Sequence, residues 1–387
     1  MKRLLWQLPI VVGAGVALFF WFGANLERFV NRVDSVVLPG VTDEALRIHD
    51  ESLVVDLHAD SLLFDRDLSV RSDVGHVDIP RLREGGVALQ MFTAATRMPF
   101  TFDLHEVDTD SSDILTVGFI AQRAPMARLG PRDRALHQAG RLSELIENSE
   151  GGLLPVRTRA ELDAAIAAHR ENADVVGAIF GVEGAHALEG DLDNLQLLFD
   201  AGVRMIGLTH FFDNEFAGSA HGIEKSGLSD LGRELVTRMQ TMGIAIDLAH
   251  LSPAAIDDVL EIANKPLLVS HTGVRATCDS PRNLSDEHIR AIADAGGVIG
   301  IGYFELAICG TDPTEIVAAM KHVIELVGDE HVALGSDYDG GTEVAFDTSQ
   351  LRALTQQMLD DGLSEESIRK IAGENAIRVL RRTLPRR

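Results

Sequence analysis

The chain of 387 residues has little cysteine, a deficit of basic residues and only one long apolar run. Two cysteines cannot supply a four-thiolate zinc site or the disulfide framework of a small secreted scaffold. Lysine and arginine number 35 against 59 acidic residues, a net charge of −24, and this excludes nucleic acid as an expected partner because phosphate binding needs a basic surface. A hydrophobic fraction of 45% with 24% charged residues is typical of a globular protein.

The one long apolar run lies at the amino terminus and carries no charge over residues 4–26. As a helix it would reach about 34 Å, enough to cross a hydrocarbon core of about 30 Å. Lys2 and Arg3 precede it, and Trp6 and Trp21 lie near its ends, where interfacial aromatic residues are favoured. We therefore expect an uncleaved transmembrane anchor with the rest of the chain on the extracytoplasmic side. A cleaved signal peptide, which would release a secreted protein, is the alternative.

Eight apolar runs alternate with amphipathic stretches along the rest of the chain. The runs occupy residues 52–60, 87–95, 175–185, 203–210, 244–250, 266–273, 297–304 and 331–340, and helical patterns between them include 228–243, 253–264 and 313–328. Near-continuous apolar strands indicate a parallel sheet that helices cover on both faces.

Eight strand–helix units predict an α/β fold, a single (β/α)8 barrel of the TIM type. We expect this barrel to form one domain over residues 41–387, after an anchor and juxtamembrane segment over residues 1–40. The long stretch 103–159 is expected to add helices to the barrel rather than a second domain. A doubly wound open sheet is the alternative topology.

Six of the eight runs end on histidine, aspartate or glutamate, which is where a barrel places its chemistry. These residues are His58, Asp60, Glu183, His210, His250, His271 and Asp337. Each alone has an ordinary explanation, because one histidine at a strand end is more often a hydrogen-bonded structural residue than a ligand. Buried together without a cation, however, they would cost several kcal/mol per uncompensated charge.

Nitrogen and oxygen ligands without thiolate favour zinc, with cobalt or manganese as substitutes. Six ligands exceed the needs of one tetrahedral zinc and suit two ions that share a carboxylate and hold a bridging hydroxide. We expect His58, Asp60 and Asp337 at the first ion, His250 and His271 at the second, and Glu183 between them. Asp337 is also placed to transfer a proton. Such a centre predicts a hydrolase.

The chain resembles the membrane dipeptidase family of metal-dependent hydrolases, also called renal dipeptidases, from about Leu53 to Val379. The segments that carry this resemblance are VVDLHAD, FGVEGAHAL, LTHFFDN, GLSDLGRELVTRMQTMGIAIDLAHLS, VSHTGVRATCDSPRNLSD, GSDYDG and GENAIRVL. The resemblance implies a barrel fold, two zinc ions at the ligands named above, and hydrolysis of dipeptides, with tolerance of a D-residue at the carboxyl-terminal position.

The same resemblance implies individual roles. Glu183 and Asp337 would be catalytic as well as metal ligands, and His210 matches the histidine that stabilises the carbonyl oxygen of the tetrahedral intermediate and so contacts substrate. Arg282 matches the arginine that binds the free carboxylate of the substrate. Animal members of the family pair cysteines at the positions of Cys278 and Cys309, so a disulfide is implied there, and export would permit this oxidation.

Other readings stay open at this stage. A metal-dependent hydrolase of another amide bond or of a lactone would use the same ligands but would not need Arg282. A barrel used for binding or structure would need metal only for stability, which the complete ligand set disfavours. We expect a dipeptide and the membrane as partners, and a homodimer is left open because the chain lacks the family's other cysteines.

Overall fold

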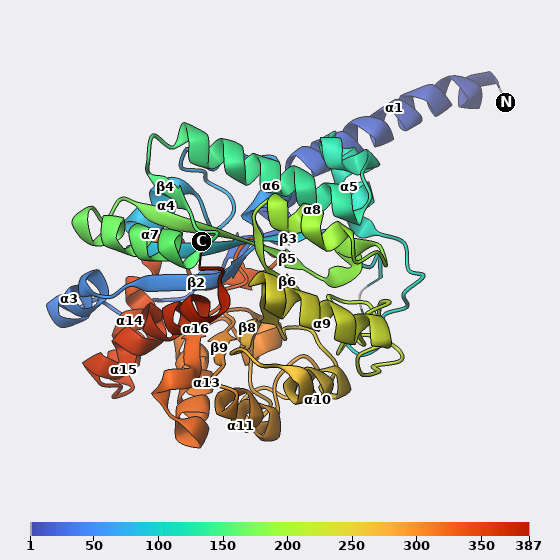
Figure 1. The fold of residues 1–387 in the computed structure, drawn as a ribbon. Coiled ribbons are helices and arrows are strands. Elements are labelled where there is room, and N and C mark those ends of the chain that lie inside the picture. The colour runs from blue at the N-terminus through green and yellow to red at the C-terminus, as the bar shows by residue number, and fades with distance from the viewer. Residues whose placement is uncertain (1, 102, 387) are drawn as a thin grey trace.

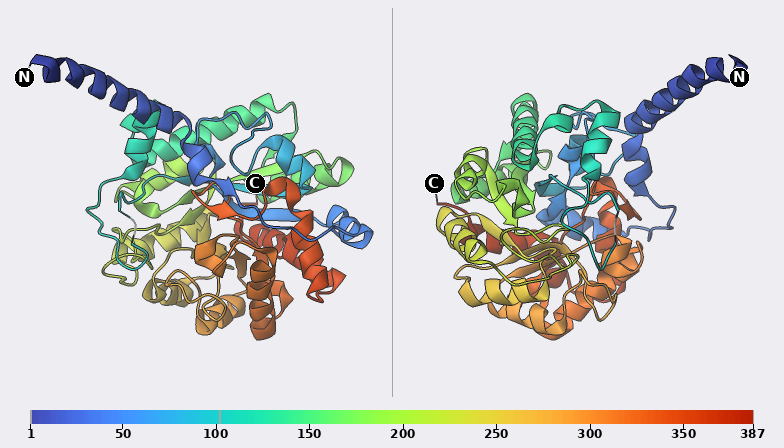
Figure 2. Two further views of the ribbon diagram at one scale, coloured as in Figure 1. Left: turned by 180° about the vertical axis from the view of Figure 1, so that it is seen from behind. Right: turned by 90° about the vertical axis from the view of Figure 1, so that its right-hand side faces the viewer.

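The computed structural model describes residues 2–101 and 103–386, those before residue 12 as backbone alone, and shows a barrel from which one helix projects (Figures 1 and 2). The barrel strands are β2 (Val54–Ala59), β3 (Val87–Ala95), β5 (Val176–Glu183), β6 (Val203–Gly207), β7 (Ala245–Asp247), β8 (Leu268–Thr272), β9 (Val298–Ile301) and β10 (Val332–Leu334). They are parallel and hydrogen-bonded in the order β3-β2-β10-β9-β8-β7-β6-β5. Pairing of β3 with β5 closes the ring, so the predicted barrel is confirmed and the open sheet is wrong.

All residues of these eight strands are buried. Inward side chains fill the barrel, and outward ones pack under the helices that surround it. The main surrounding helices are α3 (Asp43–Glu51), α4 (Ile79–Glu84), α7 (Arg159–Glu171), α8 (Asn194–Asp200), α9 (Asp230–Met242), α10 (Pro253–Ile262), α11 (Asp286–Asp294), α13 (Pro313–Val327), α14 (Arg352–Asp360) and α16 (Asn375–Thr383).

The helix boundaries follow local sequence signals. The hydroxyl of Ser229 accepts a hydrogen bond from the amide of Gly232 at the start of α9, and Gly243 ends this helix with φ of 82°. Pro313 occupies the first turn of α13, after the capping residue Asp312. The three helical patterns expected between strands are therefore confirmed, each to within two residues of its bounds.

The stretch 103–159 adds helices, as expected. It contains α5 (Ile114–Gln122) and α6 (Pro131–Asn148), and the short strand β4 (Leu153–Pro155) pairs with the first residues of β5 outside the ring. The chain closes with α15 (Glu365–Arg369), a π-helical turn (Lys370–Glu374) and α16. A second, two-stranded sheet, which the sequence did not predict, pairs β1 (Arg32–Val33) with β11 (Glu343–Val344).

The amino-terminal run forms α1 (Lys2–Ala24), which projects from the barrel, and it is followed by α2 (Leu26–Val30) (Figures 1 and 2). The end of α1 packs against α5, where Gly23 leaves room for the backbone of Ala121. The anchor prediction is not supported, because no helix over the described residues combines the length and the apolar character needed to cross a membrane. The side chains of residues 4–11, the first part of that predicted span, lie outside the described ones.

Candidate metal centre and active site

The six predicted metal ligands meet at the carboxyl-terminal end of the barrel. His58 and Glu183 belong to the ends of β2 and β5, and His271 belongs to β8. The other three, Asp60, His250 and Asp337, follow β2, β7 and β10 by one to three residues. None of the six is more than 9% exposed. Positions spread over nearly the whole barrel sequence are thus brought into one buried cluster.

Glu183 is the centre of this cluster. Its Oε1 atom lies 3.0 Å from Nε2 of His250, 3.4 Å from Nε2 of His271 and 3.7 Å from Nε2 of His58. One carboxylate therefore lies close to imidazoles of both predicted ligand groups, that is, to His58 of the first and to His250 and His271 of the second. This is the arrangement expected of a carboxylate that two metal ions share.

The first ligand group contains buried polar atoms without partners. Nε2 of His58 is 3.8 Å from Oδ1 of both Asp60 and Asp337, which is too long for a hydrogen bond. Neither Nε2 of His58 nor Oδ1 of Asp60 has a hydrogen-bond partner among the described residues. Because buried polar atoms are nearly always satisfied, these orphaned ligand atoms fit a cation that both would bind.

Three sets of ligand atoms lie within 4.8 Å of one another: Glu183–His250–His271, His58–Asp60–Glu183 and His58–Asp247–His271. The first two sets correspond to the two predicted ion sites. Asp337 approaches His58 from the loop after β10. The residues present therefore fit a divalent metal, and oxygen with imidazole nitrogen is a donor set that zinc accepts.

Asp247, which the sequence analysis did not select, is linked to two of the imidazoles through Ser270. Its carboxylate accepts hydrogen bonds from the amide of Ser270 at 2.8 Å and from the Ser270 hydroxyl at 2.6 Å. The same hydroxyl oxygen lies 2.8 Å from Nδ1 of His271 and 3.1 Å from Nδ1 of His58. An aspartate in the middle of the run 244–250 was the available signal, since aspartate is rarely fully buried unless it has a partner.

The pKa values in the cluster are shifted as expected where buried carboxylates need a positive charge beside them. Burial raises the pKa of Glu183 well above its ordinary value, with His58 opposing this. Burial likewise raises the pKa of Asp337 to about 7. Burial lowers the pKa of His58, but Glu183 and Asp60 outweigh it and raise the pKa to about 10. Protons would thus have to balance the carboxylates, and a bound cation would take their place.

The second ligand group is kept neutral. Burial lowers the pKa of His250 and of His271 well below the ordinary value, and the positive charge of Arg282 adds to this effect. Their Nε2 atoms lie 3.1 Å apart. Neutral imidazole is the form that binds a metal, so this environment favours ligation over protonation.

Arg282 and His210 lie at the same cavity. Arg282 is only 6% exposed and is therefore not a surface arginine. Its guanidinium contacts the His271 carbonyl at 3.3 Å and Nε2 of His250 at 3.2 Å, and none of the ion pairs among the described residues includes it. A buried guanidinium that forms no ion pair with a carboxylate of the described residues indicates an anionic ligand group.

His210 lies on the same cavity. Its Nε2 is 3.3 Å from Oε2 of Glu183, and burial lowers the pKa of His210 well below its ordinary value.

The cavity in front of the cluster has a volume of about 240 Å³. Asp60, Glu183, His210, His250, Arg282 and Asp337 supply its polar wall. Met98, Phe304 and Leu306, none of which the sequence analysis selected, are apolar lining residues. His221 also lines the cavity, and its Nδ1 lies 2.9 Å from the Leu104 carbonyl oxygen.

The implied disulfide between Cys278 and Cys309 is present, with a Cα–Cα distance of 5.4 Å. It joins the loop after β8 to the end of the short helix α12 (Glu305–Ile308). Asn283 ties the same two loops, because its Nδ2 donates to the carbonyls of Cys278 and Ala307 at 2.8 Å each. These links hold the loop that carries Arg282.

Comparison with known proteins gives matches over almost the whole barrel domain. The family described as membrane dipeptidase (peptidase family M19) matches residues 42–385. An uncharacterized dipeptidase of Schizosaccharomyces pombe is 33% identical over 234 residues, 57% of this chain and 56% of that one. Dipeptidase verJ of Clonostachys rogersoniana is 29% identical over 314 residues, 79% and 76% of the two chains.

A solved structure agrees with these sequence matches. It is a metallo peptidase from Rhodobacter sphaeroides, liganded with a phosphinate mimic of the dipeptide L-Ala-D-Ala. It superposes with a TM-score of 0.71 at 26% identity, covering 86% of this chain and 100% of that one.

Proposed function

This chain belongs to the membrane dipeptidase family, and from that premise we propose that it uses two zinc ions to cleave dipeptides, including those with a D-residue at the carboxyl-terminal position. The family makes it a metal-dependent dipeptidase. The observation that carries the finer proposal is the position of Glu183 between two groups of buried ligands, with the buried guanidinium of Arg282 beside them. The related metallo peptidase that binds a phosphinate mimic of L-Ala-D-Ala supports the D-residue.

His58, Asp60 and Asp337 would hold one zinc, His250 and His271 the other, and Glu183 both. When bound, zinc polarises a peptide carbonyl and lowers the pKa of water to about 7, which supplies a nucleophile at neutral pH. The network from Asp247 through Ser270 keeps the imidazoles of His58 and His271 oriented for ligation.

The side chains of the cavity supply the remaining chemistry. Arg282 would bind the free carboxylate of the dipeptide, and a guanidinium reads a carboxylate with two parallel hydrogen bonds. His210, neutral because of its burial, would donate an N–H to the carbonyl oxygen as negative charge develops there. Asp337 would accept a proton from the attacking water and return it to the leaving amine.

The size of the cavity supports a short substrate. At about 240 Å³ it lies below the usual range for ligand pockets, roughly 300–1,000 Å³. A third residue beyond the carboxyl-terminal one would have to displace the contact with Arg282. The proposal therefore predicts an exopeptidase that releases two free amino acids and does not process longer chains.

A panel of L,L and L,D dipeptides, with the matching dipeptide amides and tripeptides, tests this function. We expect hydrolysis of the dipeptides alone, loss of activity with a chelator and recovery on addition of zinc. Faster cleavage of amides, lactones or other substrates without a free carboxylate would overturn the dipeptide proposal and favour the wider hydrolase class.

We further propose that the barrel works outside the cytoplasm. The Cys278–Cys309 disulfide supports this, because such bonds persist in oxidising compartments. Attachment to the membrane through residues 4–26, release as a secreted enzyme, and assembly as a homodimer stay predictions. Fractionation of cells that express the full chain, followed by protease treatment of intact cells, would test the location. A barrel that stays protected with the cytoplasmic fraction would contradict it.

A further inference from the structure

The loop that carries Asp337, residues 335–344, has an unfavourable backbone conformation. Asp337 and Asp339 both adopt the left-handed region, with φ of 60° and 61°. Aspartate enters this region more readily than most residues, but the conformation still costs free energy and persists where the surroundings fix it. Contacts made by this loop are therefore part of what presents the Asp337 carboxylate to the metal centre.

Part of the support comes from the barrel. The amide of Asp60 donates to the carbonyl of Tyr338 at 2.8 Å. The carboxylate of Asp339, which is fully buried, accepts from the Ser61 hydroxyl at 2.6 Å and from the His76 amide at 2.5 Å. It also accepts from Nη2 of Arg66 at 2.5 Å.

Further support comes from residues 25–34, which we name the amino-terminal strap. The strap joins the projecting helix α1 to the barrel. Its strand β1 pairs with β11 inside the 335–344 loop, and the amide of Asp34 donates to the Val344 carbonyl at 2.7 Å. Oδ1 of Asn31 accepts from the amide of Gly341 at 2.8 Å. The strap thus contacts the loop only four residues from Asp337.

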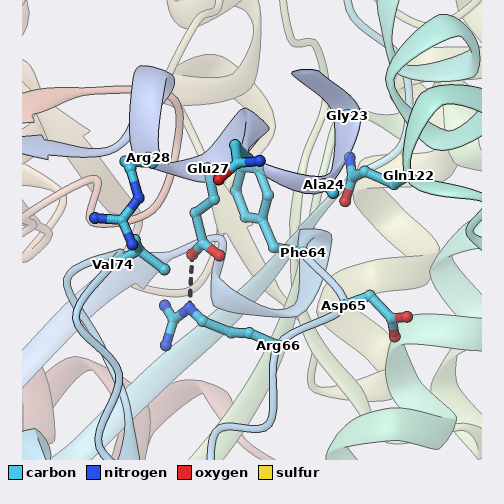
Figure 3. A pocket seen from close by; sticks show the side chains of 10 residues that line it. Gly23, Ala24, Glu27, Arg28, Phe64, Asp65, Arg66, Val74 and Gln122 are labelled. Carbon is cyan, nitrogen blue, oxygen red and sulfur yellow. Dashed lines mark hydrogen bonds and ion pairs between the residues drawn. The ribbon is translucent and has the colours of Figure 1, made fainter. Parts of the chain in front are cut away.

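An ion-pair chain makes a second link between the strap and the loop. Oε1 of Glu27 accepts from Nε of Arg66 at 2.6 Å (Figure 3). The other end of the same guanidinium contacts Asp339. The side chains of Glu27 and Arg66 are only 11% and 10% exposed. By contrast, the neighbouring pair Arg28–Asp73 is 52% and 82% exposed, an ordinary surface pair that contributes little.

We propose that the amino-terminal strap positions Asp337 for metal binding, with Asn31 and Glu27 as the positioning residues. Asn31 acts directly on the loop, and Glu27 acts by fixing the guanidinium that holds Asp339. A buried ion pair is a weak source of stability but a specific one, because each charge must keep its partner in place. The strap, which lies next to α1 and outside the barrel, would thereby control how well Asp337 is placed to bind metal. This inference rests on the proposed metal centre.

The test uses the full-length chain and its variants Asn31→Ala, Glu27→Ala and Glu27→Gln, with Arg28→Ala as the matched control on the same helix. Each protein is stripped of metal, titrated with zinc against a chromophoric chelator, and compared by hydrogen exchange of the peptide that covers 335–344. We expect about tenfold weaker binding of one zinc, and faster exchange of the loop, in Asn31→Ala and Glu27→Ala. Glu27→Gln keeps an acceptor for Arg66 and should recover most of the affinity, and Arg28→Ala should stay within twofold.

Unchanged zinc affinity and loop exchange in both alanine variants would overturn the role of the strap, even if their melting temperatures fall. If Glu27→Ala does not fold, Asn31→Ala, which removes one hydrogen bond, decides the question. Zinc binding without dipeptide hydrolysis in the unmodified chain would overturn the proposed function alone. The comparison of zinc affinities between native chain and variants would still test the role of the strap.

Discussion

Nε2 of His58 and Oδ1 of Asp60 lie 3.8 Å apart, buried, and neither has a hydrogen-bond partner among the described residues. Residues two apart at a strand end point into the same mouth of the barrel, so the two side chains are brought together by the His-x-Asp sequence at the end of β2. A donor or acceptor left unsatisfied in a protein interior costs about 1–3 kcal/mol. A cation that binds both atoms removes this cost, and folding and metal binding should therefore be coupled.

Metal removal should destabilise the fold. With zinc at about one hundred times its dissociation constant, binding adds about 2.7 kcal/mol to the free energy of unfolding. We expect a chelator to lower the melting temperature by about 5 °C and added zinc to restore it. A melting temperature that is the same with and without chelator, in protein shown to have lost its metal, would argue against ligation by the buried cluster.

Asp247→Asn should weaken the metal centre without unfolding the barrel. The substitution removes the charge that holds the Ser270 hydroxyl against His58 and His271. Loss of such a supporting contact typically costs 10–100-fold in metal affinity or activity. Zinc titration and kcat measure the effect, and Asp257→Asn, at a carboxylate whose side chain is 71% exposed on α10, is the control. Equal zinc affinity in the two variants would remove Asp247 from the site.

Arg282→Ala should change the choice of substrate as well as the rate. Hydrogen bonds to a charged group contribute about 1.5–3 kcal/mol, so kcat/KM for a dipeptide should fall roughly 10- to 100-fold. The matching dipeptide amide, which lacks the carboxylate, should lose little. The measurement is the ratio of kcat/KM for the dipeptide to kcat/KM for its amide, in native and variant enzyme. A parallel loss for both substrates would show that Arg282 supports the site without reading the carboxylate.

His49 should make the fold acid-sensitive, independently of the metal centre. It is buried, with Nδ1 at 2.8 Å from the Thr355 hydroxyl and Nε2 at 2.9 Å from the Gly85 carbonyl. Burial lowers its pKa from 6.5 to about 4. The unfolded chain therefore binds a proton between pH 6.5 and 4 that the folded chain does not, and stability is lost as pH falls through this window.

The loss attributable to His49 should total about 3 kcal/mol at pH 4 relative to neutral pH. Urea unfolding of metal-free protein at several pH values measures it. His49→Gln cannot take up the proton, so its stability should fall less over the same window. Parallel pH profiles for the native chain and the variant would contradict the assignment.

Much of the barrel and most of the metal ligands could be predicted from the sequence for one physical reason. Strands buried on both faces are nearly all apolar, so His58, Glu183 and His271 stand out where such strands end. Asp247 was missed because it lies in the middle of the predicted run 244–250 rather than at its end, and only the network through Ser270 shows what it does.

Other features depend on contacts that no local pattern contains. The burial of Arg282 results from the loop tied by Asn283 and the Cys278–Cys309 disulfide, and the family resemblance, rather than periodicity, suggested both the arginine and the disulfide. Glu27 looks like a flanking charge after an apolar run, and its partner Arg66 lies 39 residues away. Strand β1 spans only Arg32–Val33, too short to be recognised by alternation of side chains.

Zinc stoichiometry of the native chain and of Glu183→Gln, measured by equilibrium titration of metal-free protein, tests the shared carboxylate most directly. The substitution keeps the shape of the side chain and removes the charge that lies between His58, His250 and His271. We predict two zinc ions per native chain, at most one tightly bound ion in the variant, and no dipeptide hydrolysis by a variant that remains folded. Two tightly bound ions and undiminished turnover in Glu183→Gln would contradict the account.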